Sequence, residues 1–258
     1  MARIIGILSG KGGVGKTTTV ANLGTALASQ YKKNVIIVDC NITTSHLSLY
    51  LGMYYSPVTL NQVLNGKAKI QEAIYDYHVP GLRVIPASLS LKDLRGVDVS
   101  RLTRVITKLS DEADIVLLDG APGMGREAMS TMRASDEVLF ISTPFVPSTM
   151  DIIKCHQVAL EMGTKPLGIL LNMVGKERYE LTLEEVEQLS ELSVITTVPM
   201  DKNVLRSLAL KTPVVSFDPN SPASKAFLEL AGKLIGEKYV PDSFMKRFMR
   251  LLGLARKK

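Results

Sequence analysis

The sequence predicts an α/β fold, a doubly wound and mostly parallel sheet with helices on both faces. Apolar runs of strand length recur along the chain, and helical patterns separate them. The runs are continuously apolar instead of alternating with polar residues, which is typical of parallel strands covered on both faces. With 258 residues and 46% apolar residues, the chain can bury one substantial core, so a single α/β domain is expected.

The expected elements alternate along the chain. The predicted strands cover residues 3–8, 34–39, 82–86, 114–119, 137–142, 166–172 and 194–198. The predicted helices cover residues 16–30, 99–111, 126–133, 149–162, 183–192, 203–210 and 221–237. A Val-Pro-Gly turn at 79–81 separates short helices from the strand that follows it. In such folds the ligand lies at the carboxyl edge of the strands.

A glycine-rich loop joins the first strand to the first helix and has the pattern of a phosphate-binding loop. Its glycines let successive N–H groups point inward at a polyphosphate, and the following helix adds its positive end. Lys16 is expected to reach the β- and γ-phosphates, and Thr17 to place its hydroxyl on Mg²⁺. The other expected nucleotide-binding residues of the loop are Gly10, Lys11, Gly12, Gly13, Val14, Gly15 and Thr18.

Lys11 is an unusual second lysine in this loop. It is either a solvated surface lysine or a contact to a nucleotide bound by another subunit. At this point the chain resembles a known family, because Lys-Gly-Gly-Val-Gly-Lys-Thr-Thr is similar to the deviant Walker A motif of the MinD/ParA ATPases. The resemblance covers essentially the whole chain. It implies ATP/ADP and Mg²⁺ as cofactors, and a face-to-face homodimer in which Lys11 contacts the partner's ATP.

Two predicted strands end in aspartate, at Asp39 and Asp119. A carboxylate at the tip of a buried strand beside a phosphate loop is suited to hold Mg²⁺, usually through water. Each aspartate alone could instead cap a helix or form a turn. The segment 119–128 also resembles the second switch of the family, whose glycines allow movement with the γ-phosphate.

The resemblance also implies a site for the adenine base. Asn172 ends a later predicted strand and resembles the asparagine that reads the amino and N7 edge of adenine. From this residue alone, turn formation is as plausible. Pro199 and Asp201 match the family loop that packs on the base.

The chain departs from the family pattern where two subunits are expected to meet. Asn41 stands where the family has a second aspartate that positions the attacking water, so we expect hydrolysis to be slow. Its amide oxygen could still orient water, as a glutamine does in other phosphate-loop enzymes. His46 replaces an asparagine and Phe145 a glutamate of many relatives, which bears on the strength of the dimer.

The composition bears on the cellular location of the protein and on whether paired cysteines form a site. The sequence has no apolar run near the roughly 20 residues that span a bilayer and no signal-peptide pattern, so a cytoplasmic location is expected. Cys40 and Cys155 form no CxxC pair, so both are expected to be inert thiols. The missing thiol pairs disfavour a metal-insertion or metal-cluster ATPase.

The charge is concentrated in the last residues. The net charge is +6, and residues 242–258 carry six cations and one acid, or +5 of it. On a helical projection Phe244, Phe248, Leu251 and Leu252 share one face and the cations lie opposite, as in helices that lie on anionic membranes. The sequence therefore predicts an ATPase domain over 1–240 and a membrane-targeting helix over 241–258. Packing of this helix on the body or on another protein is the alternative.

Together these features predict a MinD-like ATPase that dimerises with ATP and binds the inner face of the cell membrane to position cell-division or other surface machinery. A protein activator or cargo is expected, and no specific nucleic acid. A ParA-like DNA-segregation ATPase would need a basic stripe on the body, where little surplus charge exists. A nucleotide-binding scaffold with very slow turnover is the other alternative, motivated by Asn41.

Overall fold

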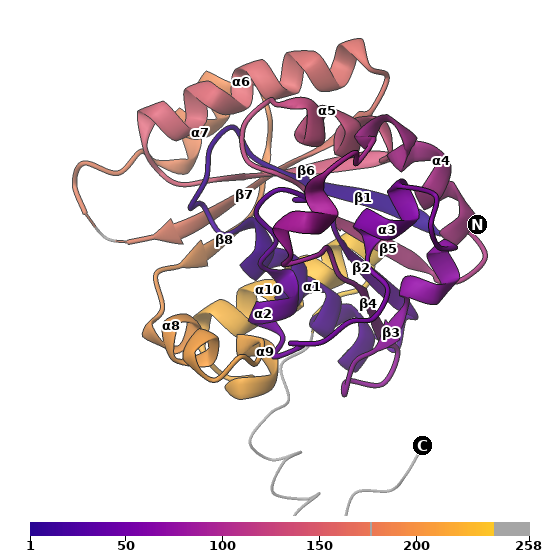
Figure 1. The fold of residues 1–258 in the computed structure, drawn as a ribbon. Coiled ribbons are helices and arrows are strands. Elements are labelled where there is room, and N and C mark those ends of the chain that lie inside the picture. Colours follow the sequence, from indigo (N-terminus) through magenta and orange to yellow (C-terminus); the bar gives the residue numbers. More distant parts are fainter. Residues whose placement is uncertain (176, 240–258) are drawn as a thin grey trace, which may run out of the picture.

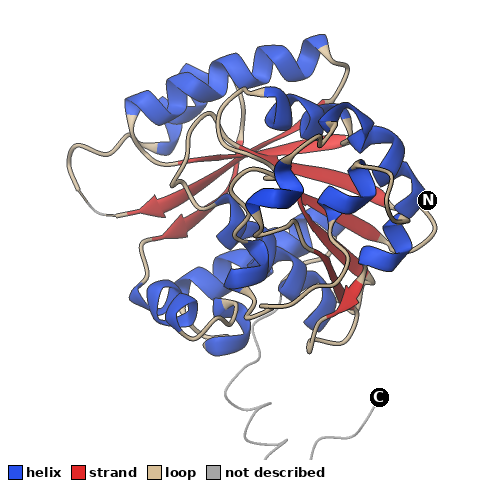
Figure 2. Ribbon diagram, in the orientation of Figure 1, coloured by secondary structure: helices blue, strands red, loops and turns tan. Residues whose placement is uncertain are grey.

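The structure is a computed structural model that describes residues 1–175 and 177–239. An eight-stranded sheet forms its centre (Figures 1 and 2), with the strand order β3-β4-β2-β5-β1-β6-β7-β8. All neighbouring strands are parallel except the edge pair β3 and β4. The strands are β1 Arg3–Leu8, β2 Val35–Asp39, β3 Tyr75–Asp76, β4 Leu82–Ile85, β5 Ile115–Asp119, β6 Glu137–Ser142, β7 Lys165–Val174 and β8 Val194–Pro199.

Helices cover both faces of the sheet, as the sequence predicts. The α-helices are α1 Lys16–Ser29, α2 Leu47–Tyr50, α3 Leu60–Leu64, α4 Leu102–Ile106, α5 Arg126–Arg133, α6 Val146–Glu161, α7 Leu183–Ser190, α8 Lys202–Ala209, α9 Val214–Phe217 and α10 Pro222–Ile235. Short 3₁₀ turns occur at η1 Ile70–Ala73, η2 Leu91–Leu94, η3 Val99–Arg101 and η4 Thr107–Leu109. No helix within the described residues is long and apolar enough to cross a membrane.

The core consists of layers on the two faces of the sheet. Successive residues of a strand point to opposite faces, so Ile5 and Ile37 pack with α1 and α10, while Ile36 and Val38 pack on the other face with α3 and α4. A third cluster lies under α6, where Phe140 is fully buried. Burial on both faces explains why the strands read as continuous apolar runs.

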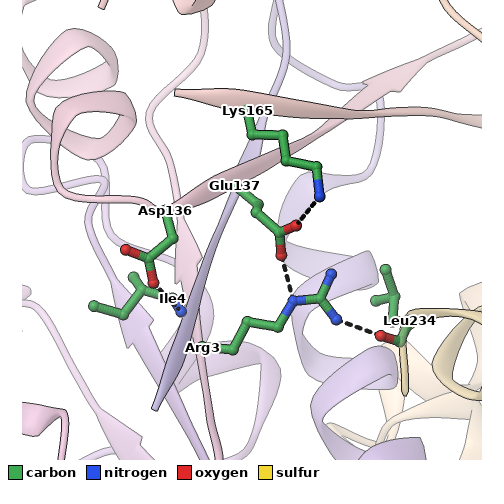
Figure 3. A network of polar contacts seen from close by, with 6 residues as sticks. All are labelled: Arg3, Ile4, Asp136, Glu137, Lys165 and Leu234. Carbon is green, nitrogen blue, oxygen red and sulfur yellow. Dashed lines mark hydrogen bonds and ion pairs between the residues drawn. The ribbon is translucent and has the colours of Figure 1, made fainter. Parts of the chain in front are cut away.

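An ion-pair network ties the amino-terminal edge of the sheet together (Figure 3). The Glu137 carboxylate of β6 accepts hydrogen bonds from Arg3 of β1 and, at 3.0 Å, from Lys165 of β7. Arg3 also donates to the carbonyl of Leu234 near the end of α10, and Asp136 accepts from the Ile4 N–H at 2.9 Å. Burial alone would raise the pKa of Glu137, but these cations hold it below its usual value.

Several elements differ from the expected ones. Residues 99–111 do not form one helix, because only Leu102–Ile106 is α-helical between two 3₁₀ turns. The helix expected from 149 begins at Val146, where Pro147 occupies the first turn, and β7 is longer than the expected strand 166–172. The predicted membrane-targeting segment 241–258 lies outside the described residues.

Candidate functional site

The loop between β1 and α1 requires glycine at position 15 for two reasons. Gly15 has a φ of +97°, in the left-handed region that residues with a side chain rarely adopt. A Cβ at this position would also lie 2.2 Å from the Nδ2 atom of Asn172. Lys16 follows as the first residue of α1, so the loop leads directly into the positive end of a 14-residue helix. This is the arrangement that the glycine-rich sequence predicts for a phosphate site.

The Lys16 ammonium lies inside the loop. Its Nζ atom donates a 2.7 Å hydrogen bond to the Ser9 hydroxyl, which in turn donates to the Lys11 carbonyl at 2.7 Å. Burial lowers the pKa of Lys16, and the nearby Asp119 carboxylate acts in the opposite direction. A buried cation held by a neutral hydroxyl is poised to exchange that partner for a phosphate oxygen. Ser9 is a site residue that sequence reasoning missed.

The two strand-end aspartates lie side by side, as predicted. Asp39 and Asp119 are direct partners in the register of β2 and β5, and both are buried. Burial raises the pKa of Asp39 to about 6, against hydrogen bonds from Ser45, Leu47 and Asn41. Burial together with the Asp39 charge raises the pKa of Asp119 to about 8. Two neighbouring buried carboxylates favour a bound cation, since a cation stabilises their charged forms.

Asp119 fits a magnesium ligand better than Asp39 does. The Asp119 Oδ1 atom is buried and has no hydrogen-bond partner, which leaves it free for a cation or its water shell. Both Asp39 oxygens are already used, Oδ1 by the Asn41 N–H and Oδ2 by Ser45 and Leu47. Asp39 therefore shapes the segment 41–47 in this structure.

Asn41 faces the same cavity as the phosphate loop, but its amide is engaged locally. A cavity of about 440 Å³ is lined by loop residues including Lys16 and Thr17, and also by Asn41 and His46. The Asn41 Nδ2 atom donates to the Thr44 carbonyl at 2.7 Å, and its Oδ1 atom accepts from the Thr44 hydroxyl at 3.0 Å. The two bonds to Thr44 fix the orientation of the amide, and its oxygen keeps one lone pair for water.

Two contacts to the segment 41–55 were not predicted. The Tyr50 hydroxyl of α2 lies 2.5 Å from the Thr18 hydroxyl of α1, and burial raises the pKa of Tyr50 to about 12, so it stays protonated. Thr43 donates through its hydroxyl to Glu127 of α5. These bonds connect the segment to the phosphate-loop helix on one side and to the helix after Asp119 on the other.

The three predicted base-site residues share one cavity. Asn172, Pro199 and Asp201 line a mostly apolar space of about 60 Å³ next to Thr18. The Asn172 amide donates to the Val14 carbonyl at 2.8 Å, so in this structure it supports the phosphate loop. The Asp201 carboxylate caps α8 through the Asn203 N–H and accepts from the Ala223 N–H of α10. Asp201 thus fixes the loop that borders the cavity.

Lys11, His46 and Phe145 lie near this edge of the sheet. Lys11 is half-buried and takes part in none of the ion pairs between described residues. The Phe145 ring stacks on Tyr179, with ring centroids 6.3 Å apart and planes 18° apart. The aromatic neighbour of Phe145 was not predicted from the sequence.

Both cysteines are buried and free, which fits unreactive thiols. Burial raises the pKa of Cys155 to about 11 and that of Cys40 well above its usual value. The described ranges 1–175 and 177–239 contain no group of three or more histidine, cysteine or acidic residues arranged to hold a metal ion.

Known proteins are similar to this chain in sequence and in fold. Residues 2–149 match the family described as AAA domain. The chain is 38% identical to an uncharacterised ATP-binding protein of Methanocaldococcus jannaschii, over 97% of this chain and 96% of that protein. It is 32% identical to the septum site-determining protein MinD of Buchnera aphidicola, over 97% of this chain and the whole of that protein.

Two solved structures match closely. The cell division ATPase MinD of Pyrococcus furiosus has a TM-score of 0.88 and 34% identity, over 92% of this chain and 99% of that one. The septum site-determining protein MinD of Pyrococcus horikoshii, solved with Mg-ADP, has a TM-score of 0.87 and 32% identity, over 91% and 96%. With the phosphate loop and the paired aspartates in place, these matches lead to one conclusion: the chain belongs to the MinD/ParA family of deviant Walker A ATPases.

Proposed function

We propose that this protein is a MinD-like switch that binds ATP with Mg²⁺, dimerises in the ATP state and hydrolyses ATP slowly. The observation that carries the proposal is the phosphate loop itself, with Lys16 buried on Ser9 and the unpartnered Asp119 oxygen beside it. The Mg-ADP complex of the Pyrococcus horikoshii MinD supports the same nucleotide and metal in this chain.

Different residues of the site bind the phosphates, the metal ion and the adenine base. Lys16 and the loop N–H groups bind the phosphates, while Thr17 and Asp119 hold Mg²⁺. The metal, when bound, neutralises charge on the β- and γ-phosphates. Asp39 keeps the segment 41–47 in position through Ser45 and Leu47. Asn172, Pro199 and Asp201 border the adenine base.

Slow turnover follows from the state of Asn41. The amide cannot accept a proton, and the Thr44 hydroxyl already donates one hydrogen bond to its oxygen. Since phosphoryl transfer depends mostly on positioning and charge neutralisation, the loss of a carboxylate lowers the rate without abolishing the reaction.

We further propose that residues 241–258 bring the ATP dimer to an anionic membrane. This proposal is supported by the sequence of the segment, in which Phe244, Phe248, Leu251 and Leu252 lie opposite the cations. Each cation adds at most ~1 kcal/mol near an anionic leaflet, so one segment binds reversibly. Two segments on one dimer gain avidity. In this proposal the protein is cytoplasmic, peripheral at the inner face of the cell membrane, and positions cell-division or other surface machinery with a protein activator or cargo.

Light scattering with nucleotide titration tests the dimer. The parent is expected to be dimeric with ATP and Mg²⁺ and monomeric with ADP.

Lys16→Ala should weaken ATP binding by about 10- to 100-fold, because each hydrogen bond to a charged group is worth about 1.5–3 kcal/mol. Lys11→Ala should keep the affinity for ATP but lose the dimer. Lys92→Ala, an exposed lysine away from the site, is the control. Equal dimerisation of the Lys11→Ala variant and the parent would return Lys11 to a surface role.

A further inference from the structure

A second pocket with a strongly positive lining lies away from the nucleotide site. It has a volume of about 170 Å³ and lies between α4 and the segment that follows α3. The helices α3 and α4 pack against each other (Figure 1). No residue of its lining belongs to the phosphate or base cavities. Its lining includes the cations Lys69, Arg101, Arg104 and Lys108 and no acidic residue.

The sequence places three of these cations on one helical face. Arg101, Arg104 and Lys108 are three and four residues apart, so they follow one side of the turns from η3 to η4. The opposite side carries Leu102 and Ile106, which are buried in the core. Every charged residue that this helix contributes to the pocket lining is a cation, and Val105 is the apolar residue that it adds.

Asp98 is close enough to Arg101 for the two charges to interact, but within the described part of the chain no ion pair holds any of the four cations. Two acids near these cations in the sequence accept local hydrogen bonds, Asp98 from the N–H and hydroxyl of Ser100 and Glu72 from the Lys69 N–H. Like charges this close in sequence disfavour folding slightly, so an anion in the pocket would relieve their repulsion.

Arg101 is fixed in place on the wall of the pocket. Its Nη1 atom donates to the Leu64 carbonyl at 2.6 Å. Gly66 lets the guanidinium approach, since a Cβ there would lie 3.2 Å from Nη1, and its φ of +74° favours glycine. A guanidinium has five N–H donors, so one bond to a carbonyl leaves the others for a ligand. A preorganised fork of this kind suits bidentate contact with phosphate.

We propose that this pocket binds the phosphate group of a phosphomonoester, either on a soluble molecule or on a lipid headgroup. Arg101 supplies the fixed donors, and Lys69, Arg104 and Lys108 supply charge around the opening. The volume is more than ten times the about 15 Å³ that a single water needs, so it admits a phosphate with part of the group that bears it. A concave site closed by cations suits a terminal phosphate better than a duplex, which favours an extended basic stripe.

The test uses the full-length protein saturated with Mg-ADP, so that the phosphate loop is occupied. Glycerol 3-phosphate is titrated while the backbone amide signals of residues 63–70 and 99–109 are followed by NMR. We expect saturable shifts confined to these segments. Arg104→Gln with Lys108→Gln should raise the dissociation constant by about tenfold or more, because each charge-assisted bond is worth about 1.5–3 kcal/mol. Both residues are exposed, so the fold should tolerate the change.

A charge-matched pair, Lys92→Gln with Lys225→Gln, removes two exposed cations elsewhere and should leave the titration unchanged. Vesicles distinguish the two sources of phosphate. The ligand is a lipid headgroup if the parent binds phosphatidic acid vesicles more tightly than phosphatidylglycerol vesicles, and if the Arg104/Lys108 double variant loses this preference while the control double variant keeps it. The ligand is a soluble molecule if the parent binds both kinds of vesicle equally and still binds glycerol 3-phosphate. The proposal is wrong if no shifts appear, if both double variants weaken them equally, or if only duplex DNA binds. Retained Mg-ADP affinity separates these outcomes from a failure of the nucleotide site.

Discussion

The buried carboxylates decide how this site behaves with pH. Asp119 lies beside Asp39 and has a pKa raised to about 8, so the nucleotide-free protein keeps a proton at the pair near neutral pH. A cation that takes the place of this proton meets an oxygen without another partner. The same residue therefore costs folding energy without Mg²⁺ and provides a ligand for it.

Asp119→Asn should make the nucleotide-free protein less sensitive to pH. A group whose folded pKa is raised binds more protons in the folded state, so its contribution to stability falls as pH rises from about 4 to about 8. The parent should lose up to about 1.4 kcal/mol per pH unit in this window for one proton. Urea unfolding at pH 5 and pH 8 measures the slope, and Asp111→Asn, at an exposed position, is the control. Equal slopes for Asp119→Asn and the parent would show that Asp119 is not the proton holder.

Asn41→Asp should raise the rate of single-turnover ATP hydrolysis by about 10- to 100-fold, at or below the low end of the ~10²- to 10⁴-fold typical of general-base help. The aspartate carboxylate can accept a proton from water. It cannot make the hydrogen bond that the Asn41 amide nitrogen donates to the Thr44 carbonyl. The affinity for ATP should change little, since Asn41 is not part of the phosphate loop. Rapid-quench measurement of the first turnover checks this. An unchanged rate with normal binding and dimerisation would shift attention to Phe145 or to a missing activator.

At the residue scale, local patterns predict chemistry but not tertiary contacts. The phosphate loop and both aspartates follow from short sequence patterns and meet in the structure as expected. The hydroxyl contact between Thr18 and Tyr50 spans 32 positions, and the bond from Asn172 to Val14 spans 158. No periodicity specifies such pairs, because they depend on how α1, α2 and β7 pack.

At the element scale, burial on both faces explains which elements were predicted well. The four central strands β1, β2, β5 and β6 have almost continuously apolar interiors, so their runs stand out from the helices around them. The elements that were predicted without bounds or not at all are short, such as α2, α9 and the two-residue strand β3. Four residues complete barely one helical turn, so they show no period, and tertiary contacts decide their conformation.

Glu137→Gln tests the network that joins β1, β6, β7 and α10. The charged carboxylate accepts from Arg3 and Lys165 and is only 8% exposed, so its loss should lower the free energy of unfolding at pH 7 by about 1–3 kcal/mol. The folded pKa lies below the usual 4.5, so this stability is present above that pH and is lost as pH falls below it.

The parent and Glu137→Gln should therefore converge in acid. Chemical denaturation between pH 3 and pH 7 measures the difference, with the exposed Glu161→Gln as the matched control. If Glu137→Gln and Glu161→Gln have the same effect at pH 7, the network adds nothing to stability.

At the scale of the whole molecule, the nucleotide site and the end of α10 lie at opposite edges of the sheet. The loops of the site follow the carboxyl ends of β1, β2 and β5, whereas α10 ends beside Arg3 at the amino-terminal edge of the sheet. In our proposal dimerisation links them, because it brings two copies of the segment 241–258 to one membrane.

Sedimentation with anionic liposomes and with DNA, side by side in ATP and in ADP, tests this account most directly. We predict that the intact protein sediments with liposomes more strongly in ATP than in ADP, that high salt weakens this only partly, and that it ignores DNA. Phe244→Ala with Phe248→Ala, or removal of residues 242–258, should abolish liposome binding and leave ATP affinity unchanged, because charge alone is screened within about 8 Å. The account is contradicted if the shortened protein still sediments with liposomes, or if the intact protein ignores them and binds DNA.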